Sequence, residues 1–258
     1  MITKNKRIVV KVGTSTLTYD TGKINFRRIN DIARVLSDLR NCGYEVILVS
    51  SGAIGVAMGK LGYSKKPSDT KIKQSLAAVG QCELMAIYDR AFSEYHHTVA
   101  QILLTRSDID IQKRMVHTKD TFNTLLAMGI IPIVNENDTV SVEEIEFGDN
   151  DSLSAIVAKI VEADILVLFS DIDGLYSSDP RSNPDAELIS RVDDISKVQG
   201  NAGDAVTNVG TGGMVTKLEA AKIANGAGIS MLIANGNNID ALYDIIDGKK
   251  VGTLFKAY

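Results

Sequence analysis

The stretch RIVVKVGTS, residues 7–15, begins with a run of apolar, mostly β-branched residues and ends in a polar turn. An apolar run without alternating polar residues indicates a strand that is buried on both faces. Lys11 interrupts this run between Val10 and Val12. A lysine in a buried strand is costly unless its ammonium group reaches an anion or open water. Lys11 therefore faces either a ligand site at the carboxyl end of the strand or solvent on an edge strand, and the strand alone favours neither.

Further apolar runs repeat the pattern along the chain, and segments with helical spacing separate them. The helical segments are residues 26–40, 71–95, the stretch up to Met128 and the residues after Gly213. Residues 175–212 are less regular and predict an excursion from the fold. Apolar strands separated by helices predict an α/β protein with a mainly parallel sheet covered on both faces. The further runs are EVILVS (45–50), TVAQILL (98–104), IIPIVN (130–135), DILVLFS (164–170) and SMLIAN (230–235).

The length, charge and cysteine content of the chain exclude several classes of protein. The chain has 258 residues, of which 45% are hydrophobic, and one large α/β domain fits this length. A net charge of −4 argues against a partner that is a nucleic acid or an anionic membrane. Cys42 and Cys82 are too few for a disulfide framework, and no apolar run approaches the length of a membrane span. We therefore expect a cytoplasmic protein that binds neither nucleic acid nor membrane.

Polar turns follow several of the predicted strands at the end where parallel sheets bind ligands. They are GTS (13–15), SSGA (50–53), NENDT (135–139) and SDIDGLY (170–176). Lys217 lies in the first turn of the helix after Gly213, where a cation opposes the helix dipole unless an anion lies nearby. Glycine-rich turns together with two unusually placed lysines indicate a site for phosphate groups.

The common nucleotide and metal motifs do not match. Gly59-Lys60 is followed by Leu61, so the P-loop pattern is absent, and no G-x-G-x-x-G follows a strand. Asp171, Asp173 and Gly174 do not have the spacing of an EF-hand. The three histidines, His96, His97 and His117, lack partners at metal-ligand spacing.

An ordered set of segments over nearly the whole chain resembles the glutamate 5-kinases of the amino acid kinase family. The IVNEND, GDND and GTGGM-x-TK motifs together distinguish this group from its relatives. The segments are VVKVGTSTL (9–17), VSSGAIGVAMGKLGY (49–63), QSLAAVGQ (74–81), QILLTR (101–106), NTLLAMGIIPIVNENDTV (123–140), FGDNDSLSA (147–155), SDIDGLYSSDPRSNPDAELI (170–189), AGDAV (202–206), GTGGMVTKLEAA (210–221) and VGTLF (251–255).

The resemblance implies a three-layer α/β/α sandwich with a mainly parallel central sheet. It also implies one amino acid kinase domain over residues 1–258, without the PUA domain that many bacterial members append. The implied reaction moves the γ-phosphoryl group of ATP to the side-chain carboxylate of L-glutamate, with Mg²⁺ required, as the first step of proline biosynthesis. The implied partners are L-glutamate, glutamyl phosphate reductase as the next enzyme of the pathway, a second copy of the chain in a homo-oligomer, and proline as feedback inhibitor through residues 139–147.

The resemblance also implies roles for individual residues. Lys11 and Lys217 would contact the phosphates and Asp151 would orient them. Asp138 would accept the α-ammonium group of glutamate, Ser51 and Asn150 would hydrogen-bond its carboxylates, and Asn135 and Gly52 would assist. The nucleotide would be held by Lys11, Gly13, Ser170, Asp171, Thr211, Gly212, Gly213, Met214, Val215, Thr216 and Lys217. A carboxylate is already ionised at neutral pH, so no general base is needed.

Alternative interpretations stay open for residues and for function. Asn135 or Asp138 could be a turn former, and Asp149 or Asp151 could cap a helix. The protein could be an acetylglutamate, carbamate or uridylate kinase of the same fold, although Asp138 with Asn150 suits a free amino acid better. A catalytically silent sensor is a third possibility, against which the presence of both Lys11 and Lys217 argues.

Overall fold

A single eight-stranded sheet forms the centre of the computed structural model, which describes residues 7–19, 21–140, 150–198 and 213–257. The strand order is β3-β4-β2-β1-β5-β7-β8-β6, and every neighbouring pair is parallel except β7 with β8. The strands are β1 (Arg7–Val12), β2 (Glu45–Ser50), β3 (Val99–Leu104), β4 (Ile131–Glu136), β5 (Ile165–Ser170), β6 (Arg191–Val192), β7 (Ser230–Asn235) and β8 (Thr253–Phe255).

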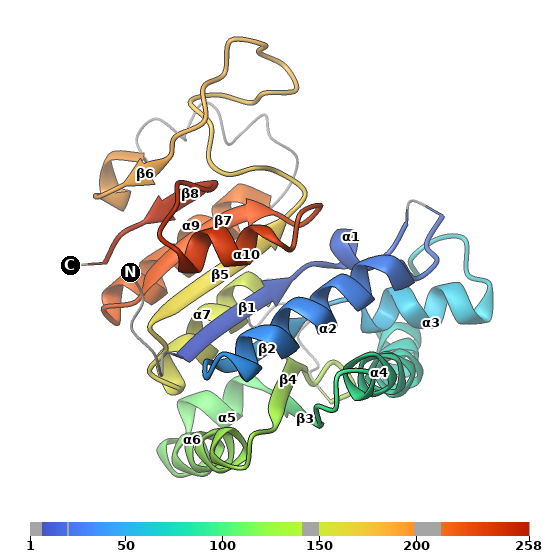
Figure 1. Ribbon diagram of the computed structural model, residues 1–258. Coiled ribbons are helices and arrows are strands. Elements are labelled where there is room, and N and C mark those ends of the chain that lie inside the picture. Colours follow the sequence, from blue (N-terminus) through green and yellow to red (C-terminus); the bar gives the residue numbers. More distant parts are fainter. Residues whose placement is uncertain (1–6, 20, 141–149, 199–212, 258) are drawn as a thin grey trace.

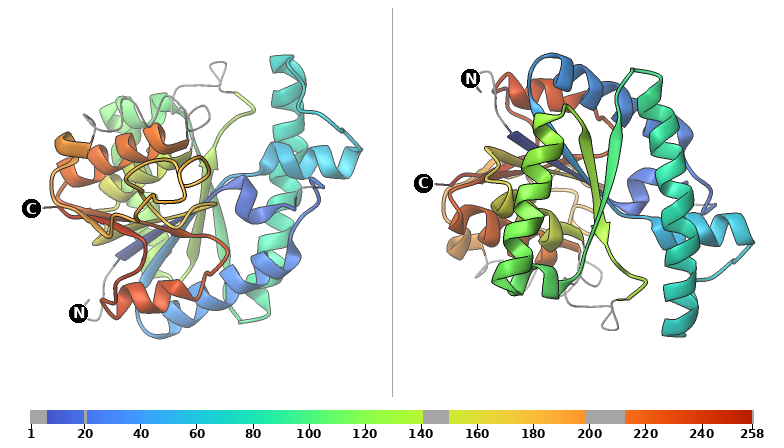
Figure 2. Two further views of the ribbon diagram at one scale, coloured as in Figure 1. Left: turned by 90° about the horizontal axis from the view of Figure 1, so that it is seen from above. Right: turned by 90° about the horizontal axis from the view of Figure 1, so that it is seen from below.

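Helices cover both faces of this sheet (Figures 1 and 2). One apolar core packs α2, α4 and α10 against the sheet, and a second packs α6, α7 and α9 against the opposite face. The prediction of a three-layer α/β/α sandwich with a mainly parallel sheet is thus confirmed. The helices are α1 (Thr14–Leu17), α2 (Phe26–Asn41), α3 (Ala53–Leu61), α4 (Thr70–Ser93), α5 (Arg106–Asp110), α6 (Gln112–Ala127), α7 (Asn150–Ile160), α9 (Gly213–Gly226) and α10 (Ala241–Ile246).

The central strand β1 shows why these strands carry unbroken apolar runs. Val10 and its alternate neighbours pack in the first core, and Val9 packs in the second, because side chains alternate between the faces of a strand. β1 lies between β2 and β5, and Lys11 is only 7% exposed. The interpretation of Lys11 as a solvent-facing lysine on an edge strand is therefore wrong. By alternation, Lys11 shares the face of Val9, which α7 covers.

The helices predicted over residues 26–40 and 71–95 are confirmed as α2 and α4, and a side chain caps the N-terminus of each. The Asn25 side chain accepts a hydrogen bond from the Arg28 N–H at the start of α2. The Asp69 side chain accepts hydrogen bonds from the N–H groups of Lys71 and Ile72 at the start of α4. Such N-caps satisfy backbone donors that have no partner within the helix.

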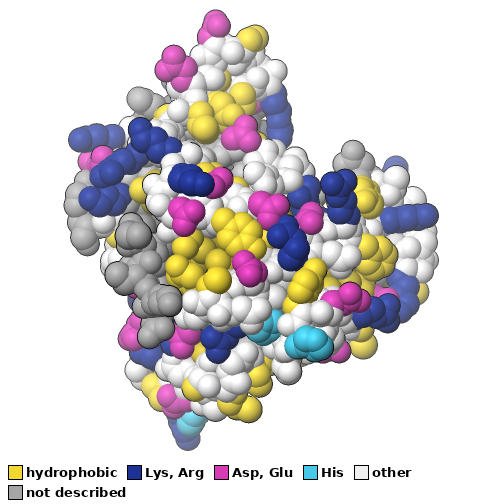
Figure 3. All heavy atoms as spheres, viewed as in Figure 1, with side chains coloured by type: hydrophobic (Ala, Val, Ile, Leu, Met, Phe, Trp, Pro, Cys, Tyr) yellow, Lys and Arg dark blue, Asp and Glu magenta, His cyan; other side chains and the backbone are white. Residues whose placement is uncertain are grey.

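The cysteines, the helices and one face of the surface can be described directly. Cys42 and Cys82 are free and exposed. None of the helices in the described part of the chain has both the length and the apolar character needed to cross a bilayer. Basic and acidic side chains are interspersed over the face shown in Figure 3. The described surface on that side therefore carries no broad field of one sign.

Candidate active site

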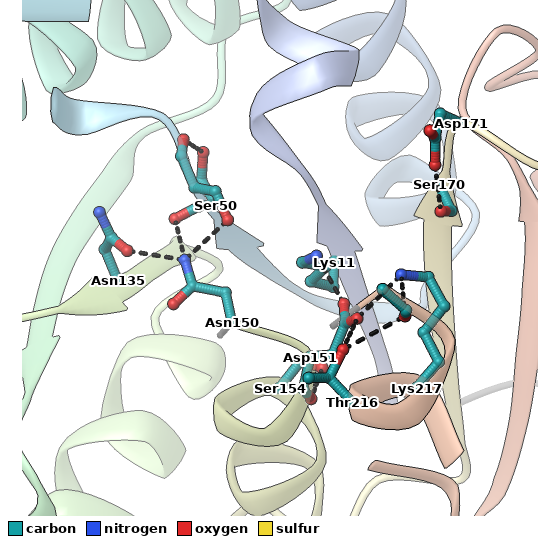
Figure 4. A network of polar contacts seen from close by, with 12 residues as sticks. Lys11, Ser50, Asn135, Asn150, Asp151, Ser154, Ser170, Asp171, Thr216 and Lys217 are labelled. Atoms are coloured by element: carbon teal, nitrogen blue, oxygen red, sulfur yellow. Dashed lines mark hydrogen bonds and ion pairs between the residues drawn. The ribbon is translucent and has the colours of Figure 1, made fainter. Parts of the chain in front are cut away.

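Asp151 stands at the centre of a buried group of charges. It lies in the first turn of α7, and its side chain is fully buried. The Nζ of Lys11 lies 2.5 Å from its Oδ1, and the Nζ of Lys217 lies 3.1 Å from its Oδ2 (Figure 4). The structure thus brings together two lysines from distant parts of the sequence, one on β1 and one on α9. We call Lys11, Asp151 and Lys217 the charge triad.

The charge triad has a positive excess. Two ammonium groups, on residues 7% and 8% exposed, share one carboxylate, and no other acidic side chain in the described residues pairs with either lysine. Burial alone would raise the pKa of Asp151, but the two lysines outweigh it and hold this pKa below its ordinary value. Asp151 therefore stays ionised, and the remaining positive charge favours an anion beside the triad.

The N-terminus of α9 adds backbone donors to this positive region. α9 begins at Gly213, and the carbonyl of Gly213 accepts a hydrogen bond of 2.9 Å from Lys217 Nζ. Thr216 Oγ1 lies 3.3 Å from Asp151 Oδ2 and so supports the same carboxylate. A side chain at Gly213 would meet open space, so the start of α9 is accessible. Free N–H groups at a helix start bind phosphate oxygens readily.

Gly13 follows β1 and Gly52 follows the end of β2, and the two glycines differ in backbone conformation. Gly13 has an ordinary φ of −84°, and a Cβ there would make an ordinary contact with Lys11 Nζ at 3.6 Å, so neither backbone conformation nor space requires glycine at this position. Gly52 has a φ of 101°, which favours glycine, and no side chain caps the start of α3 behind it. Both residues thus lie at helix starts on the carboxyl edge of the sheet.

A second polar group lies at the same edge, beside β2 and β4. Asn150 Nδ2 donates to the carbonyl of Ser50 at 3.0 Å, to Ser51 Oγ at 2.9 Å and to Asn135 Oδ1 at 2.8 Å (Figure 4). We call Ser51, Asn135 and Asn150 the acceptor cluster. Asp138 follows β4 in a turn at this edge, so its interpretation as a turn former stays open.

Asn150 and Asp151 are consecutive residues at the start of α7, yet their side chains contact different sets of residues. Asn150 joins the acceptor cluster, and Asp151 joins the charge triad. The alternative interpretation of Asp151 as a helix cap does not account for its contacts with two lysines.

Two of the remaining predicted nucleotide residues, Ser170 and Asp171, lie on the far side of the triad from Asn150 (Figure 4). Ser170 Oγ donates to Asp171 Oδ1 at 3.0 Å at the end of β5. Val215 is exposed, whereas the Met214 side chain packs in the core, so a contact of Met214 with a ligand would come from its backbone. Thr211, Gly212 and most of the segment 139–147 lie outside the described residues.

Sequence reasoning gave no role to Gln81 of α4. Its Oε1 accepts a hydrogen bond of 2.9 Å from Asn135 Nδ2, and both residues are buried. A signal was present in the sequence, because Gln81 is a polar residue on the apolar stripe formed by Ala77, Leu84 and Tyr88.

Comparisons with known proteins agree with this architecture. The Amino acid kinase family matches residues 6–235. The chain is 55% identical to glutamate 5-kinase of Clostridium perfringens over 98% of this chain and 96% of that protein. It is 56% identical to glutamate 5-kinase of Clostridium tetani over 98% of this chain and 95% of that protein. With glutamate 5-kinase of Carboxydothermus hydrogenoformans it shares 53% identity over 98% of this chain and 69% of that protein.

Solved structures share the fold at low sequence identity. UMP kinase from Bacillus anthracis superposes with a TM-score of 0.67 at 18% identity, over 98% of this chain and 97% of that one. Isopentenyl phosphate kinase from T. acidophilum superposes with a TM-score of 0.67 at 20% identity, over 96% of this chain and 99% of that one. The family match spans most of the sequence, and relatives above half identity cover almost all of it. The chain therefore belongs to the amino acid kinase family.

Proposed function

We propose that the protein transfers the γ-phosphoryl group of ATP to the side-chain carboxylate of L-glutamate, giving L-glutamyl 5-phosphate and ADP. This reaction is the first step of proline biosynthesis. The observation that carries the proposal is the charge triad beside the acceptor cluster at one sheet edge. The high identity to glutamate 5-kinases of three organisms supports the choice of glutamate.

The chemistry needs charge neutralisation more than proton transfer. A carboxylate oxygen of glutamate attacks the γ-phosphorus, a new P–O bond forms, and the bond to the β-phosphate oxygen breaks as ADP leaves. The attacking carboxylate is ionised at neutral pH, with a free pKa of ~4.3, so no base has to remove a proton. The obstacle is repulsion between two anions, and the two ammonium groups of Lys11 and Lys217 offset it.

We assign roles by position on the sheet edge. Lys11, Lys217, Gly13 and the start of α9 would hold the phosphates, with Asp151 fixing the two lysines. Ser170, Asp171, Val215, Thr216 and the backbone of Met214 would lie along the nucleotide, and the resemblance to the family adds Thr211 and Gly212 to this set. Ser51, Gly52, Asn135, Asp138 and Asn150 would hold glutamate.

Magnesium fits this arrangement as an ion carried by the phosphates. In the described residues, no three His, Cys, Asp or Glu side chains lie together as a cation site. Both oxygens of Asp151 already contact lysines, so Asp151 is poorly placed to take a metal. When bound with ATP, Mg²⁺ would supply neutralisation of the phosphate charge beside that of Lys11 and Lys217.

The proposal extends to the expected partners. Glutamyl phosphate is a labile acyl phosphate, so a reductase that consumes it would follow in the pathway. Proline, the end product, would act as feedback inhibitor, and the protein would form a homo-oligomer. Sedimentation and inhibition by proline at fixed glutamate concentration would test these two points.

Turnover with alternative acceptors tests the proposed function. Release of ADP is measured with glutamate, acetylglutamate or carbamate, and the acyl phosphate is trapped as its hydroxamate. Glutamate alone should give the hydroxamate. Turnover with acetylglutamate or carbamate, and none with glutamate, would assign a different kinase.

A lysine substitution tests the assigned chemistry. Lys217→Ala should lower kcat by about 10²–10³-fold with little change in the KM for glutamate, since it removes charge stabilisation in the transition state. Lys222→Ala is the matched control, because Lys222 is an exposed lysine on the same helix. If Lys217→Ala keeps kcat within threefold of the wild type and loses only stability, the role of Lys217 is structural.

A further inference from the structure

We infer that Gln81, far along the chain on α4, is a positioning residue that fixes how the acceptor cluster recognises its ligand. This inference rests on the proposed function and extends it to a residue that contacts neither nucleotide nor the charge triad. Three side-chain amides, of Gln81, Asn135 and Asn150, are joined by consecutive hydrogen bonds. We call these three residues the amide relay.

Two backbone groups fix the polarity of the amide relay. The N–H of Glu136 donates to Asn135 Oδ1 at 2.9 Å, so this atom of Asn135 must be the oxygen. The carbonyl of Ser50 accepts from Asn150 at 3.0 Å, so that atom of Asn150 must be the nitrogen. Because a backbone N–H only donates and a carbonyl only accepts, neither amide can be reversed without breaking a bond.

With the orientation of its amide fixed in this way, Asn150 can offer a ligand only its Oδ1 atom. Its Nδ2 has two hydrogens and already lies near three acceptors, namely the Ser50 carbonyl, Ser51 Oγ and Asn135 Oδ1. Its Oδ1 has no hydrogen-bond partner among the residues that the structure describes. Asn150 therefore offers an acceptor, which suits the α-ammonium group of an amino acid rather than a carboxylate. This replaces the carboxylate contact that the resemblance implies for Asn150.

Gln81 holds the other end of the relay. Asn135 is 3% exposed, and Gln81 Oε1 is the acceptor for its Nδ2. Without that acceptor a buried N–H₂ group would have no partner, and Asn135 would gain by turning away from Asn150. The position of Gln81 depends in turn on Gly80, where a Cβ would lie 1.7 Å from the carbonyl oxygen of Ala53. This close approach of α4 to α3 sets Gln81 beside β4.

The test separates recognition of the ammonium group from general damage. Gln81→Met keeps the length of the side chain but loses the amide acceptor, and Gln81→Glu keeps an acceptor oxygen. Hydroxamate formation is measured against glutamate concentration at saturating ATP, with glutarate, which lacks the ammonium group, as competing ligand. Gln81→Met should raise the KM for glutamate by about tenfold, which corresponds to ~1.4 kcal/mol. The kcat, the KM for ATP and the Ki of glutarate should stay within about twofold, because Asn150 keeps its bonds to the Ser50 carbonyl and Ser51 Oγ and the charge triad lies outside the relay.

A second substitution on the same helix is the matched control. Tyr88 is buried one heptad after Gln81, and its hydroxyl bonds Ser50 Oγ, which is outside the relay. Tyr88→Phe should lower the thermal midpoint without changing the ratio of glutarate Ki to glutamate KM. Gln81→Glu should recover most of the affinity for glutamate. If Gln81→Met does not fold, Gln81→Leu takes its place in the same comparison.

The outcomes distinguish the inference from the proposed function. If the wild type forms no hydroxamate with glutamate, the proposed function fails and the inference fails with it. If the wild type is active and Gln81→Met weakens glutamate and glutarate equally, or weakens neither, only the inference is overturned. The same holds if Tyr88→Phe reproduces the loss of selectivity.

Discussion

Replacement of Asp151 by asparagine tests the electrostatic reasoning most directly. The substitution keeps the size of the side chain and removes the negative charge that Lys11 and Lys217 share at 2.5 Å and 3.1 Å. Because Asp151 is fully buried and both lysines are largely buried, water cannot replace the lost counter-charge. Removing one partner from a buried ion pair costs about 3–5 kcal/mol, and we expect a loss of unfolding free energy in this range by urea denaturation.

Nucleotide should partly reverse this loss. The triad carries a net charge of +1 in the wild type and would carry +2 in Asp151→Asn, so phosphate groups gain more by binding to the variant. The increase in thermal midpoint on adding ADP should therefore be larger for the variant than for the wild type, because a ligand stabilises the folded state that binds it. Turnover should still fall by about 10²-fold or more, since the lysines lose their orientation.

The matched control is Asp240→Asn at an exposed ion pair. Asp240 contacts Arg34 at 2.6 Å, but both side chains are well exposed, and such pairs contribute about 0–1 kcal/mol. If Asp151→Asn costs no more stability than Asp240→Asn and keeps its turnover, the charge triad does not act as described. A nucleotide-induced shift smaller than that of the wild type would equally refute the account of the positive excess.

Three further predictions concern pH and packing. Folding lowers the pKa of Asp151 from its ordinary value of 3.8, so the ionised carboxylate stabilises the fold fully above pH 3.8 and less as the pH falls below it. The difference in unfolding free energy between the wild type and Asp151→Asn should therefore be the same at pH 7 and pH 5. At pH 3 this difference should be smaller. Gly80→Ala should destabilise by ~2 kcal/mol or more, measured in urea, because its Cβ would lie 1.7 Å from the Ala53 oxygen. Thr253→Val should lower the unfolding free energy by about 1–3 kcal/mol, since its buried hydroxyl accepts from Leu175 N–H at 2.7 Å.

The sheet could be predicted from the sequence because its strands are buried on both faces. Unbroken apolar runs such as residues 164–170 need no knowledge of their neighbours to be recognised. The short strands β6 and β8 gave no such signal, because two or three residues cannot show a pattern. The irregular stretch predicted over 175–212 contains β6, and in its described part Leu175 and Ile189 also pack against the second core.

The helix α3 shows a limit of a different kind. Its sequence, AIGVAMGKL, contains two glycines, which have low helix propensity. A Cβ at Gly59 would lie 2.8 Å from the carbonyl oxygen of Gly22, and one at Gly55 would lie 3.4 Å from Thr14 Cγ2. Close packing against another segment thus requires glycine at Gly59, whereas a Cβ at Gly55 would make only an ordinary contact. Tertiary contacts override local propensity here, and those contacts are invisible in the local sequence.

In the candidate site, too, some residues could be predicted from the sequence and others could not. Lys11 and Lys217 could be singled out because each is a charge in an unfavourable local position, which an unseen anion or acid explains, although open water was a second explanation for Lys11. Gln81 gave a weaker signal, as a polar residue on the apolar stripe of α4, and its role arises from a hydrogen bond to Asn135 of β4. The two lysines could therefore be recognised in the sequence, whereas the role of Gln81 became clear only from its contact with Asn135.

The start of α7 explains how one sheet edge can serve both halves of the reaction. Consecutive residues of a helix point in directions about 100° apart, so Asn150 and Asp151 reach different neighbours from adjoining backbone positions. Asn150 fixes the acceptor cluster, and Asp151 fixes the lysines that would hold the phosphate. In the proposed reaction, the separation between the two substrates would then be set by one rigid helical turn rather than by the packing of independent loops. A displacement of α7 would move both groups together, which would keep the attacking oxygen and the phosphate in register.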